Sequence, residues 1–209
     1  MSTQKTNNRK YELKARAESQ ERTRQRIAKA AAELHEKIGP AETTVAEIAR
    51  RAGVSRLTVY KHFPDNAVLY PACSAHHLSQ HPLPDFGAAL APDDPVERLR
   101  SLLRTVYGGW YRGQRRIMRN LQRDRGVDPA LDEFMRANSD AALGGLADTV
   151  TAGFELDPDQ AARVRAMVGV ALDFWTWERL DGQGLGDEAA ADLMTEAVAS
   201  VAGAQATAR

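Results

Sequence analysis

The stretch TTVAEIARRAGVSRLTVYKHF, residues 43–63, constrains the fold more than any other part of this chain. Thr44 has the chemistry of a helix N-cap, and Glu47 follows it at the spacing of a capping box. An apolar face of helical period follows, made of Val45, Ile48, Ala49 and Ala52. Gly53 tolerates the left-handed backbone that ends a helix, and Ser55 is a second N-cap. We therefore predict a helix, a tight turn and a second helix.

The second of these helices has an apolar side and a polar side. Val59 and Phe63 are four residues apart and form the side that we expect to be buried. The other side combines groups that bind phosphate with groups that hydrogen-bond to base edges, as expected of a helix that enters the major groove of DNA. These residues are Arg56, Thr58, Tyr60, Lys61 and His62. The alternative is an ordinary helical hairpin with a solvated basic face.

Residues 43–63, with the helix before them and FPDN after them, resemble the TetR family of transcriptional regulators. The matching residues are Thr44, Ile48, Ala49, Ala52, Gly53, Val54, Ser55, Val59, Tyr60, His62, Phe63 and Leu69. The resemblance covers about residues 22–70, and beyond them it rests on length and helical pattern. It implies an all-α homodimer with an N-terminal DNA-binding domain and a helical domain that binds a ligand and dimerises. Most members are repressors that a small molecule releases from DNA.

The resemblance adds Thr44, Ser55, Leu57 and Asn66 to the expected DNA contacts. Asn66 follows Asp65 and stands where the family often has a lysine that holds a phosphate. Its amide can donate to a phosphate without the positive charge. Leu57 stands where a small residue is common, and it is suited either to touch a thymine methyl group or to shield the turn.

We predict an all-α fold of about nine helices in three parts. These are a basic N-terminal arm at 1–19, a three-helix DNA-binding domain at 20–66 and an effector-binding and dimerisation domain at 67–209. The first helix is expected to begin near Gln20, to present Arg22–Arg26 toward phosphates and to end at Gly39-Pro40. Further helices are expected over 65–77, 95–110, 114–125, 129–154, 158–180 and 186–202, with a loop over 80–95.

The net charge of zero hides an asymmetry along the chain. Residues 1–63 hold 14 Lys and Arg against 7 Asp and Glu, and the remainder holds 14 Arg against 21 acids. A basic N-terminal part suits double-stranded DNA as partner, and a basic arm is able to reach the minor groove. The alternative is a solvated tail without a role in DNA binding.

Composition also predicts the compartment. The single cysteine excludes an internal disulfide and favours a reducing environment. No apolar run reaches the roughly 18 residues of a membrane span, and the N-terminus lacks the apolar core of a signal peptide. We therefore expect a cytoplasmic protein without a membrane partner.

The last two long helices, 158–180 and 186–202, are the expected homodimer interface. Phe174 and Trp177 lie off the stripe of the first helix, so this helix is apolar on more than one side. A surface of small residues on the second helix permits close approach, and it consists of Ala189–Ala191, Ala197 and Ala199. Two recognition helices related by a two-fold axis would read a palindrome with half-sites roughly 34 Å apart. The alternative is packing within one chain.

An unidentified small-molecule effector is the expected ligand of the C-terminal domain, and no cofactor is predicted. Aromatic and Met side chains line many apolar pockets, although at helical spacing they also form cores. The candidate ligand-binding residues are Trp110, Tyr111, Met118, Phe134, Asn138, Met167 and Trp175. A run of arginines, residues 112–125, is interpreted as a solvated face paired with acids, with an anionic effector as the alternative.

Two other function classes compete with a ligand-responsive repressor. Cys73, His77 and His81 would share a face of a continuous helix, which suggests a metal-responsive regulator, but Pro82 interrupts and no metal site is predicted. An architectural DNA-binding protein without an effector is the second alternative. An enzyme is not expected, because the sequence has no Gly-rich phosphate loop, nucleophile elbow or HExxH pair.

Overall fold

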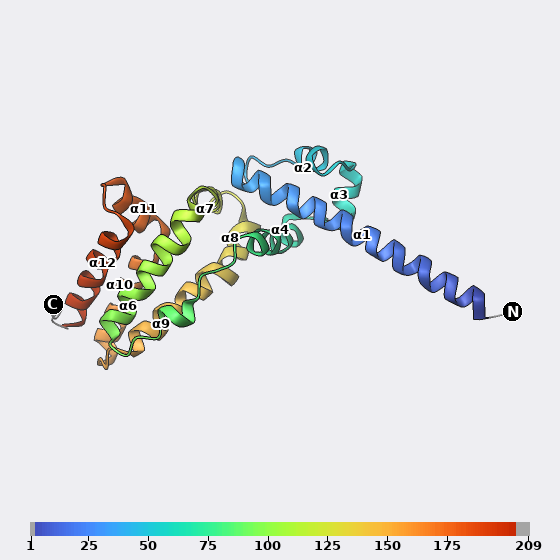
Figure 1. Ribbon diagram of the computed structural model, residues 1–209. Coiled ribbons are helices and arrows are strands. Elements are labelled where there is room, and N and C mark those ends of the chain that lie inside the picture. Colours follow the sequence, from blue (N-terminus) through green and yellow to red (C-terminus); the bar gives the residue numbers. More distant parts are fainter. Residues whose placement is uncertain (1–2, 204–209) are drawn as a thin grey trace. The chain divides into compact units, whose positions relative to one another are not determined.

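Helices are the regular secondary structure of the described part of the chain (Figure 1). The computed structural model describes the backbone of residues 3–203 and the side chains of residues 13–203. No strand occurs in this part of the chain, which confirms the predicted all-α class. The first of two compact units contains the chain up to Pro82 together with Arg119–Phe134. The second contains Leu83–Met118 and the chain from Met135 onward.

Helix α1 spans Thr3–Lys37, so the prediction that it begins near Gln20 is wrong. No Gly or Pro occurs before Gly39, and good helix formers dominate the segment, so nothing interrupts the helix. The side chains of residues 13–22 are all exposed, and helix propensity rather than packing therefore maintains this part. The predicted end is confirmed, because Gly39 has φ 96° and Pro40 follows. The DNA contact of the basic arm stays a prediction.

Three further helices complete the N-terminal part of the first unit. They are α2 (Val45–Ala52), α3 (Arg56–His62) and α4 (Asn66–Gln80). Helix α4 packs on α1. The proposed functional boundary at residue 66 therefore differs from the boundary of the compact unit, which lies at Pro82.

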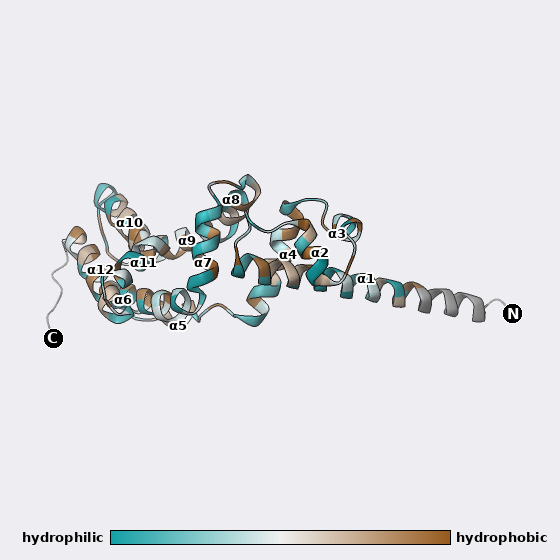
Figure 2. Cartoon of the chain, turned by 90° about the horizontal axis from the view of Figure 1, so that it is seen from above, coloured by the Kyte–Doolittle hydropathy of each residue, from teal (hydrophilic) through white to brown (hydrophobic). Residues whose placement is uncertain are grey.

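The second unit departs from the predicted helix ends at several places. The predicted loop over 80–95 contains a short helix, α5 (Phe86–Ala89). Helix α6 (Pro95–Val106) continues through a π-helical turn, η1 (Tyr107–Tyr111), into α7 (Arg112–Asp124), where a break was predicted. Gly108 and Gly109 lie within that π-turn. Figure 2 shows that α7 is mostly hydrophilic.

Two other predicted helices are also divided. Helices α8 (Pro129–Met135) and α9 (Ala141–Ala152) are joined by a second π-turn, η2 (Arg136–Asp140). The helix predicted over 158–180 is interrupted, giving α10 (Pro158–Leu172) and α11 (Phe174–Gly182). Asp173 is extended at φ −71° and ψ 133°, and its carboxylate caps α11 through the Thr176 N–H. The last helix, α12 (Asp187–Ala202), matches its prediction closely.

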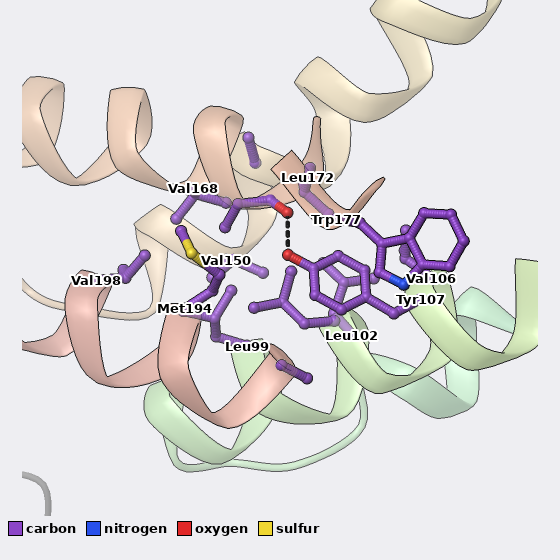
Figure 3. Close-up of a cluster of buried hydrophobic side chains, with 14 of the residues drawn as sticks. Leu99, Leu102, Val106, Tyr107, Val150, Val168, Leu172, Trp177, Met194 and Val198 are labelled. Atoms are coloured by element: carbon purple, nitrogen blue, oxygen red, sulfur yellow. Dashed lines mark hydrogen bonds between the residues drawn. The ribbon is translucent and has the colours of Figure 1, made fainter. Parts of the chain in front are cut away.

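The core of the second unit contains two phenols that are hydrogen-bonded to the end of α10, and Figure 3 shows the bond of Tyr107. Tyr107 donates to the Ala171 carbonyl at 2.5 Å, and Tyr111 donates to the Leu172 carbonyl at 2.5 Å. Carbonyls in the last turn of a helix have no partner within that helix. The two tyrosines satisfy these groups in a buried environment, and each such bond contributes about 1 kcal/mol.

Candidate nucleic-acid interface

The turn between α2 and α3 has the geometry that the sequence predicted. Thr44 Oγ1 accepts from the Glu47 N–H at 3.2 Å, and Ser55 Oγ accepts from the Thr58 N–H at 3.1 Å. Gly53 adopts the left-handed conformation, with φ 66° and ψ 41°. The next N–H, from Val54, bonds to the Ala49 carbonyl at 3.0 Å. A side chain at residue 53 would therefore strain the turn even where space is free.

Helix α3 is held by its apolar side and by α1. Val59 and Phe63 are 1% and 3% exposed, so the predicted buried side is confirmed. The Arg24 guanidinium lies 4.4 Å from the centroid of the Phe63 ring and donates to the His62 carbonyl at 3.1 Å. Arg24 was grouped with residues expected to approach phosphates, but these contacts place it against the end of α3 instead.

The opposite side of α3 is open to solvent. Leu57 is 79% exposed and Tyr60 is 53% exposed, and Arg56 and Lys61 are exposed as well. Thr58 and His62 are partly exposed. The Thr58 hydroxyl lies 2.8 Å from that of Ser55, so the two hydroxyls are hydrogen-bonded at the start of α3. The helix thus presents two cations, a phenol and an apolar side chain on one short face.

Asn66, the first residue of α4, has a partner that the sequence did not reveal. Its Nδ2 donates to Asp128 Oδ2 at 2.9 Å, and the Tyr70 hydroxyl donates to the same oxygen at 2.5 Å. Asp128 Oδ1 accepts from the N–H groups of Ala130 and Leu131, at the start of α8. Burial opposes ionisation of Asp128, but these bonds, led by that from Tyr70, lower its pKa.

Residues 119–134 belong to the first unit. They also form hydrogen bonds with the last turn of α1 and with the loop that follows it. Asn120 Nδ2 donates to the carbonyls of His35 and Glu36 at 3.0 and 2.8 Å. Asp124 is 3% exposed and accepts from the Ala41 N–H at 3.0 Å. The Asp128-Pro129 pair is a recognisable helix start in the sequence. The partners on α1 and α4 lie far away in sequence and carry no local signal.

The three residues that would suggest a metal-responsive regulator, Cys73, His77 and His81, do not form one cluster. Cys73 is buried, and its Sγ lies 3.6 Å from Nδ1 of His35. Burial raises the pKa of the Cys73 thiol to about 12 and lowers the pKa of His35 to about 4. His77 and His81 lie with their ring centroids 4.7 Å apart. Among residues 13–203, no group of three or more His, Cys, Asp or Glu is placed to hold a metal ion.

The predicted effector residues fall into different surroundings. Tyr111 belongs to the core of the second unit, and Trp110, Met118 and Met167 pack against that core while partly exposed. Phe134 belongs to the first unit, with its ring centroid 6.2 Å from that of Tyr70. Asn138 lies exposed in η2. Trp175 is 41% exposed beside Phe174. The effector site stays a prediction.

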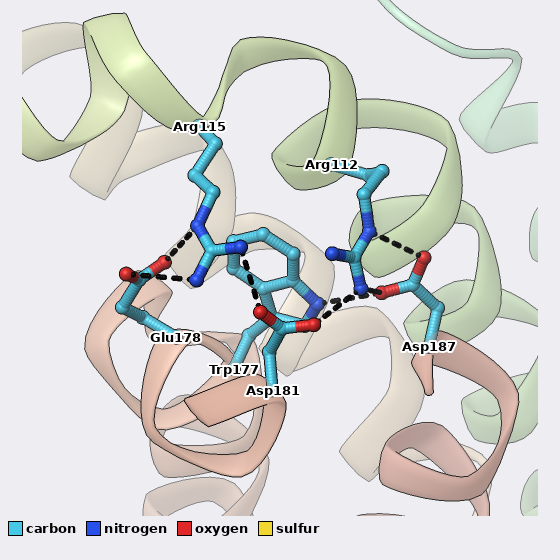
Figure 4. A network of polar contacts seen from close by, with 6 residues as sticks. All are labelled: Arg112, Arg115, Trp177, Glu178, Asp181 and Asp187. Carbon is cyan, nitrogen blue, oxygen red and sulfur yellow. Dashed lines mark hydrogen bonds and ion pairs between the residues drawn. The ribbon is translucent and has the colours of Figure 1, made fainter. Parts of the chain in front are cut away.

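Arg112 and Arg115 on α7 pair with acids, as predicted for the arginine run over 112–125 (Figure 4). Arg112 bonds to Asp181 and Asp187 at 2.6 and 2.7 Å, and Arg115 bonds to Glu178 and Asp181 at 2.9 and 2.7 Å. Hydrogen bonds from Arg112 are the main cause of the lowered pKa of Asp181 and Asp187.

The same network encloses the buried Trp177 side chain. The Arg112 and Arg115 guanidinium carbons lie 5.1 and 5.4 Å from the Trp177 ring centroid. The indole N–H donates to Asp187 at 2.9 Å. These contacts join α7, α11 and the start of α12, so Arg112 and Arg115 have a structural role in the second unit.

No helix in the described part of the chain is long and apolar enough to cross a membrane.

Comparison with known proteins agrees with this architecture. Residues 27–73 match the family described as bacterial regulatory proteins, tetR family. An uncharacterized HTH-type transcriptional regulator of Mycobacterium tuberculosis is 44% identical over 54 residues, 26% of this chain and 29% of that protein. The HTH-type transcriptional regulator SrpR of Pseudomonas putida is 43% identical over 86 residues, 41% of this chain and 37% of that protein. Each match thus spans less than two thirds of these relatives.

Solved structures extend the similarity to most of the chain. NalD, the secondary repressor of the MexAB-OprM multidrug efflux pump in Pseudomonas aeruginosa, is 26% identical with a TM-score of 0.58. The alignment covers 88% of this chain and 97% of NalD. A TetR-like regulator from Rhodococcus sp. RHA1 is 23% identical with a TM-score of 0.57, covering 87% of this chain and 96% of that one.

The fold and the exposed face of α3 define an all-α protein with an N-terminal helix-turn-helix. Residues 27–73 thus match the tetR family of bacterial regulatory proteins, and the fold of the chain is that of TetR-like regulators.

Proposed function

We propose that this protein is a sequence-specific, DNA-binding transcriptional regulator. It acts as a cytoplasmic homodimeric repressor that a small-molecule effector releases from a palindromic operator. The observation that carries the proposal is the exposed face of α3, a capped helix whose other side is buried. Such a helix is rigid enough to present side chains to base edges.

The expected DNA contacts divide by their chemistry. Lys61 and Tyr60 are suited to phosphate oxygens, because they offer a cation and a hydroxyl donor. Arg56 and Thr58 are suited to base edges, because they offer directed donors near the start of the helix. Leu57, at 79% exposure, is suited to a thymine methyl group. Thr44 and Ser55 contribute at the starts of α2 and α3.

The helix predicted over 158–180 is interrupted at Asp173, so the dimer interface that we propose consists of α10 and α12. These two helices pack against each other within the subunit. Ala190, Ala191 and Ala199 are buried there, so this part of the predicted small-residue surface serves packing within the chain. Val170, on α10, is 48% exposed, and Leu193, on α12, is 43% exposed. These side chains remain available to a second subunit.

The regulatory part of the proposal rests on the relatives. NalD is named as a repressor, and its similarity covers 88% of this chain. Release by an effector requires only that the effector bind better to a state with lower DNA affinity. The candidate residues for effector contact are the partly exposed Trp110, Met118 and Met167.

The test is selection of bound sequences from a pool of random duplexes by the purified full chain, at a stated salt concentration of about 100 mM. Recovery of one palindrome, bound by two subunits, is the expected result. A pool with no enriched motif and only salt-sensitive binding would contradict a base-reading role for α3. An enriched site without two-fold symmetry would contradict the homodimer.

A further inference from the structure

The start of α4 lies next to the proposed recognition helix. Only residues 63–65 separate His62, the last residue of α3, from Asn66, so the Cα atoms of these two residues lie at most about 14 Å apart. Asn66 is exposed, and it is the first helical residue of α4. A helix N-terminus favours anions, and the Asn66 amide adds a donor there. If α3 faces DNA as proposed, Asn66 would thus lie near enough to bind a neighbouring DNA phosphate.

Two carboxylates oppose such a contact. Asp65 caps α4, with its Oδ1 accepting from the Val68 N–H at 3.0 Å. Asp128 Oδ2 accepts from the Asn66 amide at 2.9 Å. A phosphate would therefore have to displace Asp128 from Asn66, and it would meet the negative charge of both acids. Carboxylate and phosphate oxygens are similar acceptors, so the exchange offers little net gain.

The two oxygens of Asp128 have separate tasks. Oδ1 caps α8 through the Ala130 and Leu131 N–H groups, at 2.9 and 3.3 Å. Oδ2 holds Asn66 and Tyr70 of α4. A substitution that retains one acceptor oxygen is therefore expected to keep the cap of α8 and to release α4.

We propose that Asp128 is a positioning residue that withholds the Asn66 amide from DNA and so limits the affinity of the protein for DNA. The proposal rests on the proposed function, because it assumes that α3 and the start of α4 face DNA. A purely structural role for Asp128 makes the opposite prediction, since loss of a structural bond would weaken both folding and DNA binding.

The test measures DNA binding by fluorescence anisotropy at about 100 mM salt, with the duplex recovered by selection and with a random duplex. Asp128→Asn keeps Oδ1 for the cap and replaces Oδ2 with a donor. Asp128→Ser keeps a cap hydroxyl that is too short to reach α4. Both variants are expected to bind the selected duplex about fivefold more tightly than the wild type, the effect of one hydrogen bond.

The decisive comparison is the same substitution combined with Asn66→Ala. The gain from Asp128→Asn is expected to fall below about twofold when Asn66 is absent, because the released donor is then missing. An equal gain in both backgrounds would assign the effect to charge alone and overturn the proposal. No gain from either Asp128 variant would overturn it as well.

Tyr70→Phe is the matched control, because it removes the other bond to Oδ2 and leaves Asn66 held. It is expected to lower the melting temperature without tightening DNA binding, and tighter binding by this variant would contradict the assignment to Asn66. A wild type that fails to distinguish the selected duplex from the random one would instead contradict the proposed function. The two failures are therefore distinguishable.

Discussion

His35, in the first unit, has a buried imidazole ring, and burial favours its neutral form. It is 5% exposed, and its ring faces Cys73 and Tyr70. Burial lowers its pKa to about 4, although Asp124 and Asp128 act in the opposite direction. Between about pH 6.5 and pH 4, His35 is therefore protonated in the unfolded chain and neutral in the folded protein.

This difference predicts that stability falls as the pH falls through that window. We expect the His35 contribution to lower the free energy of unfolding by about 2 kcal/mol between pH 7 and pH 5. Urea titrations at the two pH values measure the free energy of unfolding. In His35→Gln, the decrease of about 2 kcal/mol that His35 contributes is expected to be absent. His81→Gln, which replaces an exposed histidine, is the control. An unchanged pH dependence in His35→Gln would contradict the assignment.

At the scale of the element, the capped starts of α2, α3 and α4 follow the local sequence, and the break at Asp173 does not. Thr44, Ser55 and Asp65 cap α2, α3 and α4 through bonds within three residues, so a local pattern identifies them. The division at Asp173 differs, because Tyr107 and Tyr111 of a distant helix satisfy the carbonyls that it exposes. Helical periodicity continues across that residue and gave no sign of the break.

Helix α3 yields a prediction about the division of labour among its side chains. Tyr60→Phe and Lys61→Ala are expected to weaken binding to all sequences, and Lys61→Ala is expected to reduce the salt slope by about 1. Arg56→Ala or Thr58→Ala is expected to cost about 1–3 kcal/mol on the selected duplex and to alter the sequence preference. Arg179→Ala, an exposed arginine on α11, controls for net charge. Equal losses of affinity for the selected and random duplexes in all four variants would contradict this division between phosphate contacts and base contacts.

At the scale of the whole molecule, the proposed dimer would double the proposed DNA-binding surface. The outward side of α10 carries small and apolar residues at helical spacing, namely Ala162, Ala166, Gly169 and Val170, all exposed. Small side chains let helices approach closely, and an exposed valine in such a row favours a partner helix. The same helix packs against α12 within the chain, which fixes its orientation in the second unit.

Val170→Glu is therefore expected to weaken the dimer at least about tenfold, because a charge would be desolvated at the interface. Sedimentation equilibrium measures the dissociation constant. The matched control is Val127→Glu, since Val127 is 71% exposed and lies in the first unit. A dimer that tolerates Val170→Glu would place the interface elsewhere, and a monomeric Val127→Glu would show that the effect is not specific to α10.

The sequence by itself determined the helical class, the caps of α2 and α3, the left-handed turn at Gly53 and the buried pair Val59 and Phe63. Each of these follows from bonds or periodicities that act within a few residues. The tertiary structure decided the rest: the pairing of Arg112 with Asp181 and Asp187, the break at Asp173, and the contact between Asp128 and Asn66. These depend on groups that lie far apart in sequence, where local propensity carries no information about partners.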